Sequence, residues 1–303
     1  MITLLEPPRP RGLPSGGFRY QERVVAALGD DARRISVPPA ELHDKVLELR
    51  RQDPSAQVVV DGWFADLASD PLPDDVTALL HMAPARPDWS TRPLHVVATG
   101  QPTADAIAGQ AASVTVVRPG VDACFSAAPR SGDPTFAIVC AGTICKAKGQ
   151  RRLVGALRGL RAPWRLTIVG STTHDPDEVA ALREEAEGLP VDVHDAVLPE
   201  TLAALYREHD VFASLSERES YGMAAAEATA AGLALFGLDV GELATFGDDR
   251  ARFLLPADAS DRQLRDQLES LAANVPLRQA GPRAPRTWEQ VGRELAAAVT
   301  AAG

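Results

Sequence analysis

The sequence predicts an α/β protein built from two Rossmann-like domains whose parallel sheets face each other across a cleft. Short apolar runs, about four to seven residues long, alternate along the chain with amphipathic or alanine-rich segments of helical length. The apolar runs are continuous, which is typical of strands buried on both faces of a parallel sheet. A chain of 303 residues is long for one compact domain and sufficient for two.

The first part of the chain contains six expected strands, of which QVVVDGWF is the clearest. We place these strands at 2–6, 33–38, 57–64, 76–82, 93–100 and 113–120. The helices expected between them cover about 18–28, 41–52 and 102–110.

The second part repeats the alternation. Its expected strands lie at 136–142, 164–171, 191–197, 210–216 and 233–239, and its expected helices at about 148–160, 177–188, 200–209, from Met223, and from Trp288. A stretch rich in Pro, Gly, Ser and Asp, residues 119–135, separates the two parts. We therefore expect an N-terminal domain of residues 1–121, completed by a C-terminal helix at about 286–303, and a second domain of residues 122–285.

Charge and cysteine content limit the function classes. There are 41 acidic and 31 basic residues, a formal net charge of −10, which disfavours non-specific nucleic-acid binding and docking on an anionic membrane. The cysteines (Cys124, Cys140 and Cys145) are odd in number and lack metal-ligand spacing, so we expect reduced thiols in a cytoplasmic protein. We expect no signal peptide and no stable membrane association, because the first residues and the apolar runs do not fit either.

Two glycine-containing loops at the ends of expected strands are candidate phosphate sites. Gly16 and Gly17 follow the first strand and precede a helix, where backbone amides can approach a phosphate closely, although such a pair is also common in plain turns. The loop 142–149 lacks the Gly-Lys-Ser/Thr ending of a Walker A loop. Its Lys146 and Lys148 can neutralise a diphosphate or simply solvate the start of a helix, and the sequence leaves both open.

The segment ERESYGMAAAEATAAG, residues 217–232, is the third candidate site. The helix expected from Met223 would present the free amides of Met223 and Ala224 to an anion, and small side chains there allow close approach. Glu219 precedes this helix and Glu227 lies one turn inside it. The two carboxylates can accept hydrogen bonds from a sugar and a ribose, or they can merely complement the helix dipole.

Several sequence blocks, in order and spacing, resemble the C-terminal half of family-four retaining glycosyltransferases, which have the GT-B fold. The blocks are RPGVD (118–122), AGTICKAKG (141–149), LTIVGS (166–171), the segment 209–232, and GLDVGEL (237–243). Glu219 and Glu227 fit the Glu-x7-Glu motif of that family. The N-terminal half is similar more weakly, through LPSGGFRY, VVVDGWF and LLHMAP.

The resemblance implies roles for individual residues. Lys148 would bind the donor diphosphate, Glu219 would hold the hydroxyls of the transferred sugar, and His81 would lie near the reacting centre. Glu227 would bind the nucleotide ribose. The other implied donor-binding residues are Gly16, Gly17, Thr143, Lys146, Gly170, Ser171, Tyr221, Gly222, Met223 and Ala224.

Two departures from the family pattern affect the expected substrate. Thr143 stands where the family usually has an arginine, and whether Lys146 compensates is left open. The segment after His81 is short, about ten residues from Met82 to the next strand, whereas relatives have longer acceptor-handling segments there. The short segment favours a small soluble acceptor over a lipid-linked one.

The resemblance thus implies a retaining glycosyltransferase that uses a nucleoside diphosphate sugar, with a UDP-sugar favoured because it is the commonest donor in such folds. Neither a metal ion nor another cofactor is expected, because Lys148 and helix amides would stabilise the leaving group. The alternatives are a non-catalytic nucleotide-sugar-binding module and a GT-B nucleotide-sugar epimerase. A dehydrogenase is disfavoured, since no Gly-x-Gly-x-x-Gly follows the first strand.

Overall fold

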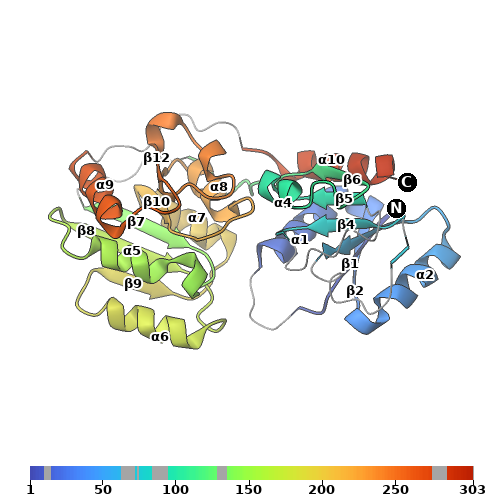
Figure 1. Cartoon of the computed structure of the whole chain (residues 1–303), viewed down its shortest axis with the longest axis horizontal. Helices are drawn as coiled ribbons and strands as arrows, with labels where there is room; N and C mark the ends of the chain where they lie inside the picture. The colour runs from blue at the N-terminus through green and yellow to red at the C-terminus, as the bar shows by residue number, and fades with distance from the viewer. Residues whose placement is uncertain are drawn as a thin grey trace. The chain divides into compact units, whose positions relative to one another are not determined.

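The computed structural model describes residues 1–9, 15–62, 72–73, 75–83, 95–127, 135–274 and 285–302. These residues form two compact α/β units, labelled by element in Figure 1. Among them, unit 1 takes the residues up to Gly120 and those from Arg286 onward, and unit 2 takes those between Val121 and Pro285.

Unit 1 contains a six-stranded parallel sheet with the order β2-β1-β3-β4-β5-β6. Its strands are β1 (Ile2–Glu6), β2 (Ala32–Ser36), β3 (Gln57–Asp61), β4 (Thr77–Leu80), β5 (His95–Ala98) and β6 (Ser113–Val116). Its described α-helices are α1 (Gly16–Leu28), α2 (Leu42–Gln52), α4 (Gln101–Ala106) and α10 (Trp288–Ala302), with short 3-10 turns at Gly29–Asp31 and Pro39–Glu41.

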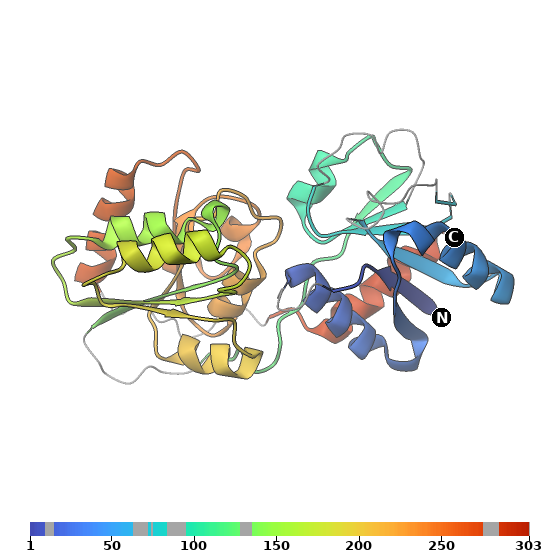
Figure 2. The ribbon, with the colours of Figure 1, turned by 90° about the horizontal axis from the view of Figure 1, so that it is seen from below.

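Both faces of the unit 1 sheet are buried, as the continuous apolar runs predict. Leu5 and Val60 pack in one cluster with residues of α2, whereas Leu4 and Val59, next to them in sequence, point to the opposite face and are equally buried. On α10, Gly292 lies against α1, so the end of the chain packs beside its beginning. Figure 2 shows the red α10 next to the blue α1.

Unit 2 contains a second six-stranded parallel sheet, with the order β12-β11-β10-β7-β8-β9. Its strands are β7 (Phe136–Ala141), β8 (Trp164–Val169), β9 (Val191–His194), β10 (Val211–Ser214), β11 (Ala234–Leu238) and β12 (Arg252–Leu255). Its α-helices are α5 (Gln150–Leu157), α6 (Pro176–Glu185), α7 (Pro199–Arg207), α8 (Met223–Ala230) and α9 (Asp261–Ala273). The 3-10 turns are Lys146–Lys148, Leu243–Thr245 and Asp249–Ala251.

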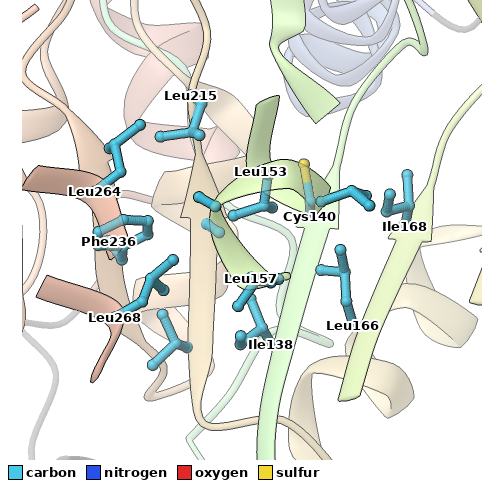
Figure 3. Close-up of a cluster of buried hydrophobic side chains, with 14 of the residues drawn as sticks. Ile138, Cys140, Leu153, Leu157, Leu166, Ile168, Leu215, Phe236, Leu264 and Leu268 are labelled. Carbon is cyan, nitrogen blue, oxygen red and sulfur yellow. The ribbon is translucent and has the colours of Figure 1, made fainter. Parts of the chain in front are cut away.

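The larger core of unit 2 lies between its sheet and the helices α5, α6 and α9. In Figure 3, Ile138 and Cys140 of β7 point toward Leu153 and Leu157 of α5. Alternate residues of the same strands, such as Val139 of β7, join a second cluster that includes α7 and α8. Burial on both faces holds the carboxyl ends of the strands in fixed positions, and the loops that follow them carry the candidate site.

The structure adds two elements that the sequence analysis left out, β12 and α9. β12 is an edge strand whose residues are all half-buried, so its sequence RFLL has a weak apolar signal. α9 begins with a capping box, in which Ser260 and Gln263 satisfy each other's backbone amides, and this is a readable sequence signal. The helix expected at 102–110 is shorter than predicted and ends at Ala106.

Candidate functional site

The strand order locates the candidate site in unit 2. From β7 the chain runs outward through β8 and β9 on one side, and then returns to place β10, β11 and β12 on the other. In open parallel sheets, ligands bind at the carboxyl ends of the two strands where the order reverses. In this unit those strands are β7 and β10, which lead into the loops 142–149 and 215–222.

The loop after β7 is tightly packed at its two ends. A Cβ on Gly170, which follows β8, would lie 1.8 Å from the carbonyl oxygen of Gly142. Gly149 has φ +69° and closely approaches the carbonyl oxygen of Leu215. The buried Gln150 donates a hydrogen bond from Nε2 to the Thr143 carbonyl at 3.0 Å. These contacts fix the backbone on either side of Lys148.

The loop after β10 is joined to the loop after β7 by backbone contacts. The amide of Glu217 donates to the carbonyl of Ala147 at 2.9 Å. The buried Ser216 turns its hydroxyl back to the carbonyl of Arg218 at 3.0 Å. Two predicted site loops, more than sixty residues apart in sequence, therefore form one structure.

Lys148 and Glu219 form an ion pair where these two loops meet. The Nζ of Lys148 lies 2.5 Å from the Oε1 of Glu219, with 32% and 18% of the respective side chains exposed. Cys140 lies beneath the pair, and burial raises the pKa of its thiol to about 12, while the charge of Lys148 opposes the rise. The structure thus brings together the two residues predicted to handle the donor diphosphate and sugar.

Helix α8 begins at Met223, as the sequence predicts. Gly222 precedes it with φ +98°, and the described side chains provide no N-cap hydrogen bond at this end. Gly222, Met223 and Ala224 are half-exposed, whereas the helix from Ala225 onward is buried. The start of α8 therefore offers backbone amides and a positive dipole end beside Glu219.

Other predicted residues of unit 2 lie deeper in the structure. Glu227 is only 2% exposed, and the ring of Tyr221 packs edge-on against Phe246 at 5.0 Å, so Tyr221 can offer a ligand its backbone rather than its ring. Ser171 is buried and its hydroxyl lies 3.3 Å from that of Thr173. Lys146 opens the 3-10 turn and is exposed.

Unit 1 contains a second polar cluster, also at the carboxyl ends of its strands. Helix α1 begins at Gly16, and its second residue, Gly17, lies against the ring of His81, which follows β4. A Cβ on Gly17 would lie 2.7 Å from that ring. The Nε2 of Gln21 lies 3.3 Å from the Nε2 of His81 and also donates to the Oδ2 of Asp61. Burial lowers the pKa of His81, and the nearby carboxylate of Asp61 partly opposes this shift.

The sequence analysis did not identify Gln21 or Asp61 as site residues. Asp61 carried a readable signal, because it is a carboxylate directly after the apolar run VVV of a buried strand. Gln21 carried none, since a glutamine inside a helix is ordinarily exposed, whereas this one is fully buried.

Asp175 and Asp177 have Asp-x-Asp spacing, yet Asp175 is engaged as the N-cap of α6, accepting from the amide of Glu178 at 3.1 Å. Within the described ranges, no three His, Cys, Asp or Glu side chains are grouped as a metal site.

None of the described helices is long and apolar enough to cross a membrane. Most of the short segment after His81 lies outside the described residues.

Comparison with known proteins agrees with the site in unit 2. The family described as glycosyl transferases group 1 matches residues 135–274, which include both loops and α8. These residues, called the group 1 region below, are therefore similar to that family over slightly less than half of the chain. The chain also resembles the D-inositol 3-phosphate glycosyltransferase of Xylanimonas cellulosilytica, with 34% identity over 151 residues, 44% of this chain and 36% of the relative. The matched region thus spans about a third of that relative's length.

Solved structures show how far the fold extends beyond the group 1 region. Anabaena HepE in complex with UDP and glucose has a TM-score of 0.74 and 15% identity, covering 99% of both chains. A glycosyltransferase from Rickettsia africae has a TM-score of 0.74 and 14% identity, covering 99% of this chain and 93% of its own. At this identity the likeness concerns the fold, and it confirms the predicted GT-B class with two Rossmann-like units.

Proposed function

We propose that the protein is a glycosyltransferase that moves a sugar from a nucleoside diphosphate sugar, with a UDP-sugar favoured, to a small soluble acceptor. The observation that carries the proposal is the Lys148–Glu219 pair at the reversal point of the sheet, beside the start of α8. A cation and a helix N-terminus suit a diphosphate, and an adjacent carboxylate suits sugar hydroxyls. The UDP complex of the HepE fold relative supports the choice of nucleotide.

In the proposed reaction, the bond between the anomeric carbon and the diphosphate breaks, and negative charge develops on the leaving phosphate. Lys148 and the amides at the start of α8 would stabilise this charge by preorganised electrostatics. The Lys148 ammonium now contacts Glu219, so donor binding would exchange one anionic partner for another. These groups can supply the positive charge that the leaving group needs, and we propose that no metal ion is required.

The remaining roles follow the same arrangement. Glu219 would accept hydrogen bonds from hydroxyls of the transferred sugar, and Glu227, one turn inside α8, would bind the ribose. In unit 1, Gly16, Gly17 and His81 would act near the phosphate and the reacting centre. We propose that the acceptor hydroxyl oxygen bonds the anomeric carbon on the face from which the diphosphate leaves, and that its proton passes to the leaving phosphate oxygen, which gives retention. The resemblance to retaining family-four enzymes supports this outcome.

Donor binding is the first test. We would measure thermal unfolding with UDP, GDP, ADP and their glucose conjugates for the wild type, Lys148→Met and Glu219→Gln. A ligand at a hundredfold excess over its Kd stabilises the native state by about 2.7 kcal/mol. The control is Lys45→Met, which removes another lysine from an ion pair, the one with Glu48 on α2. The expected result is a shift with one nucleotide that falls in Lys148→Met and persists in Lys45→Met.

Turnover then separates the alternatives. Sugar transfer to an acceptor panel, with the anomeric configuration read by NMR and with chelator added, tests retention and metal independence. Loss of Lys148 should lower kcat by about 10²–10³, as expected for a group that stabilises developing charge. Binding without turnover would favour a nucleotide-sugar-binding module, and an isomerised donor without acceptor would favour an epimerase. No binding of any nucleotide would refute the proposal.

A further inference from the structure

We propose that Asp61 and Gln21 are positioning residues that fix His81 as the neutral tautomer protonated on Nδ1, so that His81 offers a hydrogen-bond donor rather than a base. The inference rests on the proposed function only in assigning the partner of that donor, an oxygen of the sugar or acceptor. The tautomer itself follows from the contacts of unit 1.

The first step is the burial and spacing of the cluster. Gln21 is fully buried in α1, and only 8% of the Asp61 side chain and 19% of the His81 side chain are exposed. The Nε2 of Gln21 contacts both the Oδ2 of Asp61 and the Nε2 of His81. The direct separation of His81 Nε2 from Asp61 Oδ2 is 3.8 Å, too long for a hydrogen bond. Gln21 is therefore the link between the two.

The second step is the orientation of the Gln21 amide. An ionised carboxylate only accepts hydrogen bonds, so Asp61 requires the NH2 side of the amide to face it. The opposite orientation would place two oxygens in contact. It would also turn the NH2 group to the position of Oε1, where the described residues offer no hydrogen-bond partner. Asp61 thereby determines which end of Gln21 meets His81.

The third step is the tautomer. The NH2 group has two hydrogens, one for Asp61 and one for His81, so the Nε2 of His81 must accept. A neutral ring that accepts at Nε2 carries its proton on Nδ1. Burial lowers the pKa of His81 and so favours the neutral ring. The ring packs closely against Gly17 and edge-on against Tyr20, with 5.3 Å between the ring centroids, and these contacts restrict its rotation. Among the described residues, no hydrogen bond engages Nδ1.

The chemical consequence is specific. A ring protonated on Nδ1 and occupied at Nε2 cannot take a proton from an acceptor hydroxyl through either nitrogen without breaking the contact with Gln21. It can donate from Nδ1 to an oxygen that becomes more negative as the glycosidic bond to the diphosphate breaks. His81 would then contribute electrostatic stabilisation, and Asp61 would act on His81 through Gln21.

Long-range 1H–15N correlation spectra of the full chain, labelled on its six histidines, report the tautomer directly. His81→Asn assigns the signal. At pH 7.5 the wild type should show the Nδ1–H tautomer. Gln21→Leu removes the intervening donor and should move the proton to Nε2, toward Asp61. Asp61→Asn should give a mixture of the two His81 tautomers, because an amide at position 61 can both donate and accept and therefore no longer determines the orientation of Gln21.

A matched control is Asp105→Asn, which alters another Gln–Asp hydrogen bond, that of Gln101 with Asp105 on the exposed surface of α4. Its His81 signal should be unchanged. A wild-type His81 with its proton on Nε2 or on both nitrogens would overturn the inference, as would an unchanged tautomer in Gln21→Leu. Thermal shifts with UDP, measured in parallel, show separately whether the proposed donor site has failed.

Discussion

The close contact between Gly170 and Gly142 predicts that a glycine-to-alanine substitution destabilises unit 2 at Gly170, whereas the same substitution at Gly155 stabilises it. In Gly170→Ala the new Cβ would lie 1.8 Å from the Gly142 carbonyl oxygen, and real Cβ contacts essentially never fall below 3.0 Å. The loop after β7 must therefore recede by more than 1 Å. The Gly142 oxygen belongs to the backbone, so no flexible side chain can move aside to relieve the clash.

The cost follows from what this movement disturbs. Overpacking a well-packed site typically costs 1–3 kcal/mol. The movement also strains the hydrogen bond from the amide of Gly142 to the carbonyl of Val169, 2.9 Å long, and such a bond contributes about 1 kcal/mol. We expect Gly170→Ala to lower the free energy of unfolding of unit 2 by about 3 kcal/mol, or its Tm by roughly 6–12 °C.

Gly155→Ala is the matched control. Gly155 lies inside α5, and a Cβ there would meet nothing within 4 Å. Because alanine is the better helix former, this variant should be stabilised by about 0.5–1 kcal/mol. The assay is urea unfolding followed by circular dichroism and fluorescence, fitted with separate transitions for the two units. A Gly170→Ala variant within 0.5 kcal/mol of the wild type would refute the reasoning.

Three further predictions concern individual side chains. Leu166→Ala, deep in the unit 2 core and fully buried, should cost about 2–5 kcal/mol in urea unfolding, and a loss under 1 kcal/mol would contradict the packing. The Cys140 thiol, with its pKa raised to about 12, should not react with a thiol reagent at pH 8, whereas the half-exposed Cys145 should. Burial lowers the pKa of His81, so the unfolded state takes up its proton first as the pH falls below about 6.5. The wild type should therefore lose more stability than His81→Asn between pH 7.5 and 5.5, and equal losses would argue against a buried neutral ring.

The parts of the candidate site that could be predicted from sequence are those encoded in contiguous stretches. The start of α8 at Met223 follows from a run of small residues after a glycine, and the spacing of Glu219 and Glu227 is visible in one segment. Only the resemblance to known glycosyltransferases assigned Lys148 to the same site as Glu219. The sequence of its own loop was equally consistent with a lysine that solvates the start of a helix. The ion pair itself depends on two strands lying side by side.

The cluster of unit 1 shows what sequence reasoning missed. Gln21, Asp61 and His81 come from three elements about forty and twenty residues apart, and each has an ordinary local explanation. Their relationship exists only after parallel pairing has aligned the ends of β3 and β4 beside α1. Similarly, the apolar pattern did not show that the ring of Tyr221 is used for packing against Phe246.

The return of α10 to unit 1 has a consequence for the order of events during synthesis on the ribosome. Trp288 of α10 lies against Gly120, and its ring packs edge-on against that of Tyr20 with 5.7 Å between the ring centroids. Unit 1 therefore lacks part of its packing until α10 has been synthesised. The chain between Gly120 and α10 takes roughly 10–30 s to synthesise at 5–20 residues per second. The described residues of unit 2 come from one stretch of sequence, so unit 2 can fold in that interval. During the same time, α1 lacks the helix α10 that packs against its apolar side. In the nascent chain, the side of α1 that contacts α10 is therefore exposed until α10 has been synthesised.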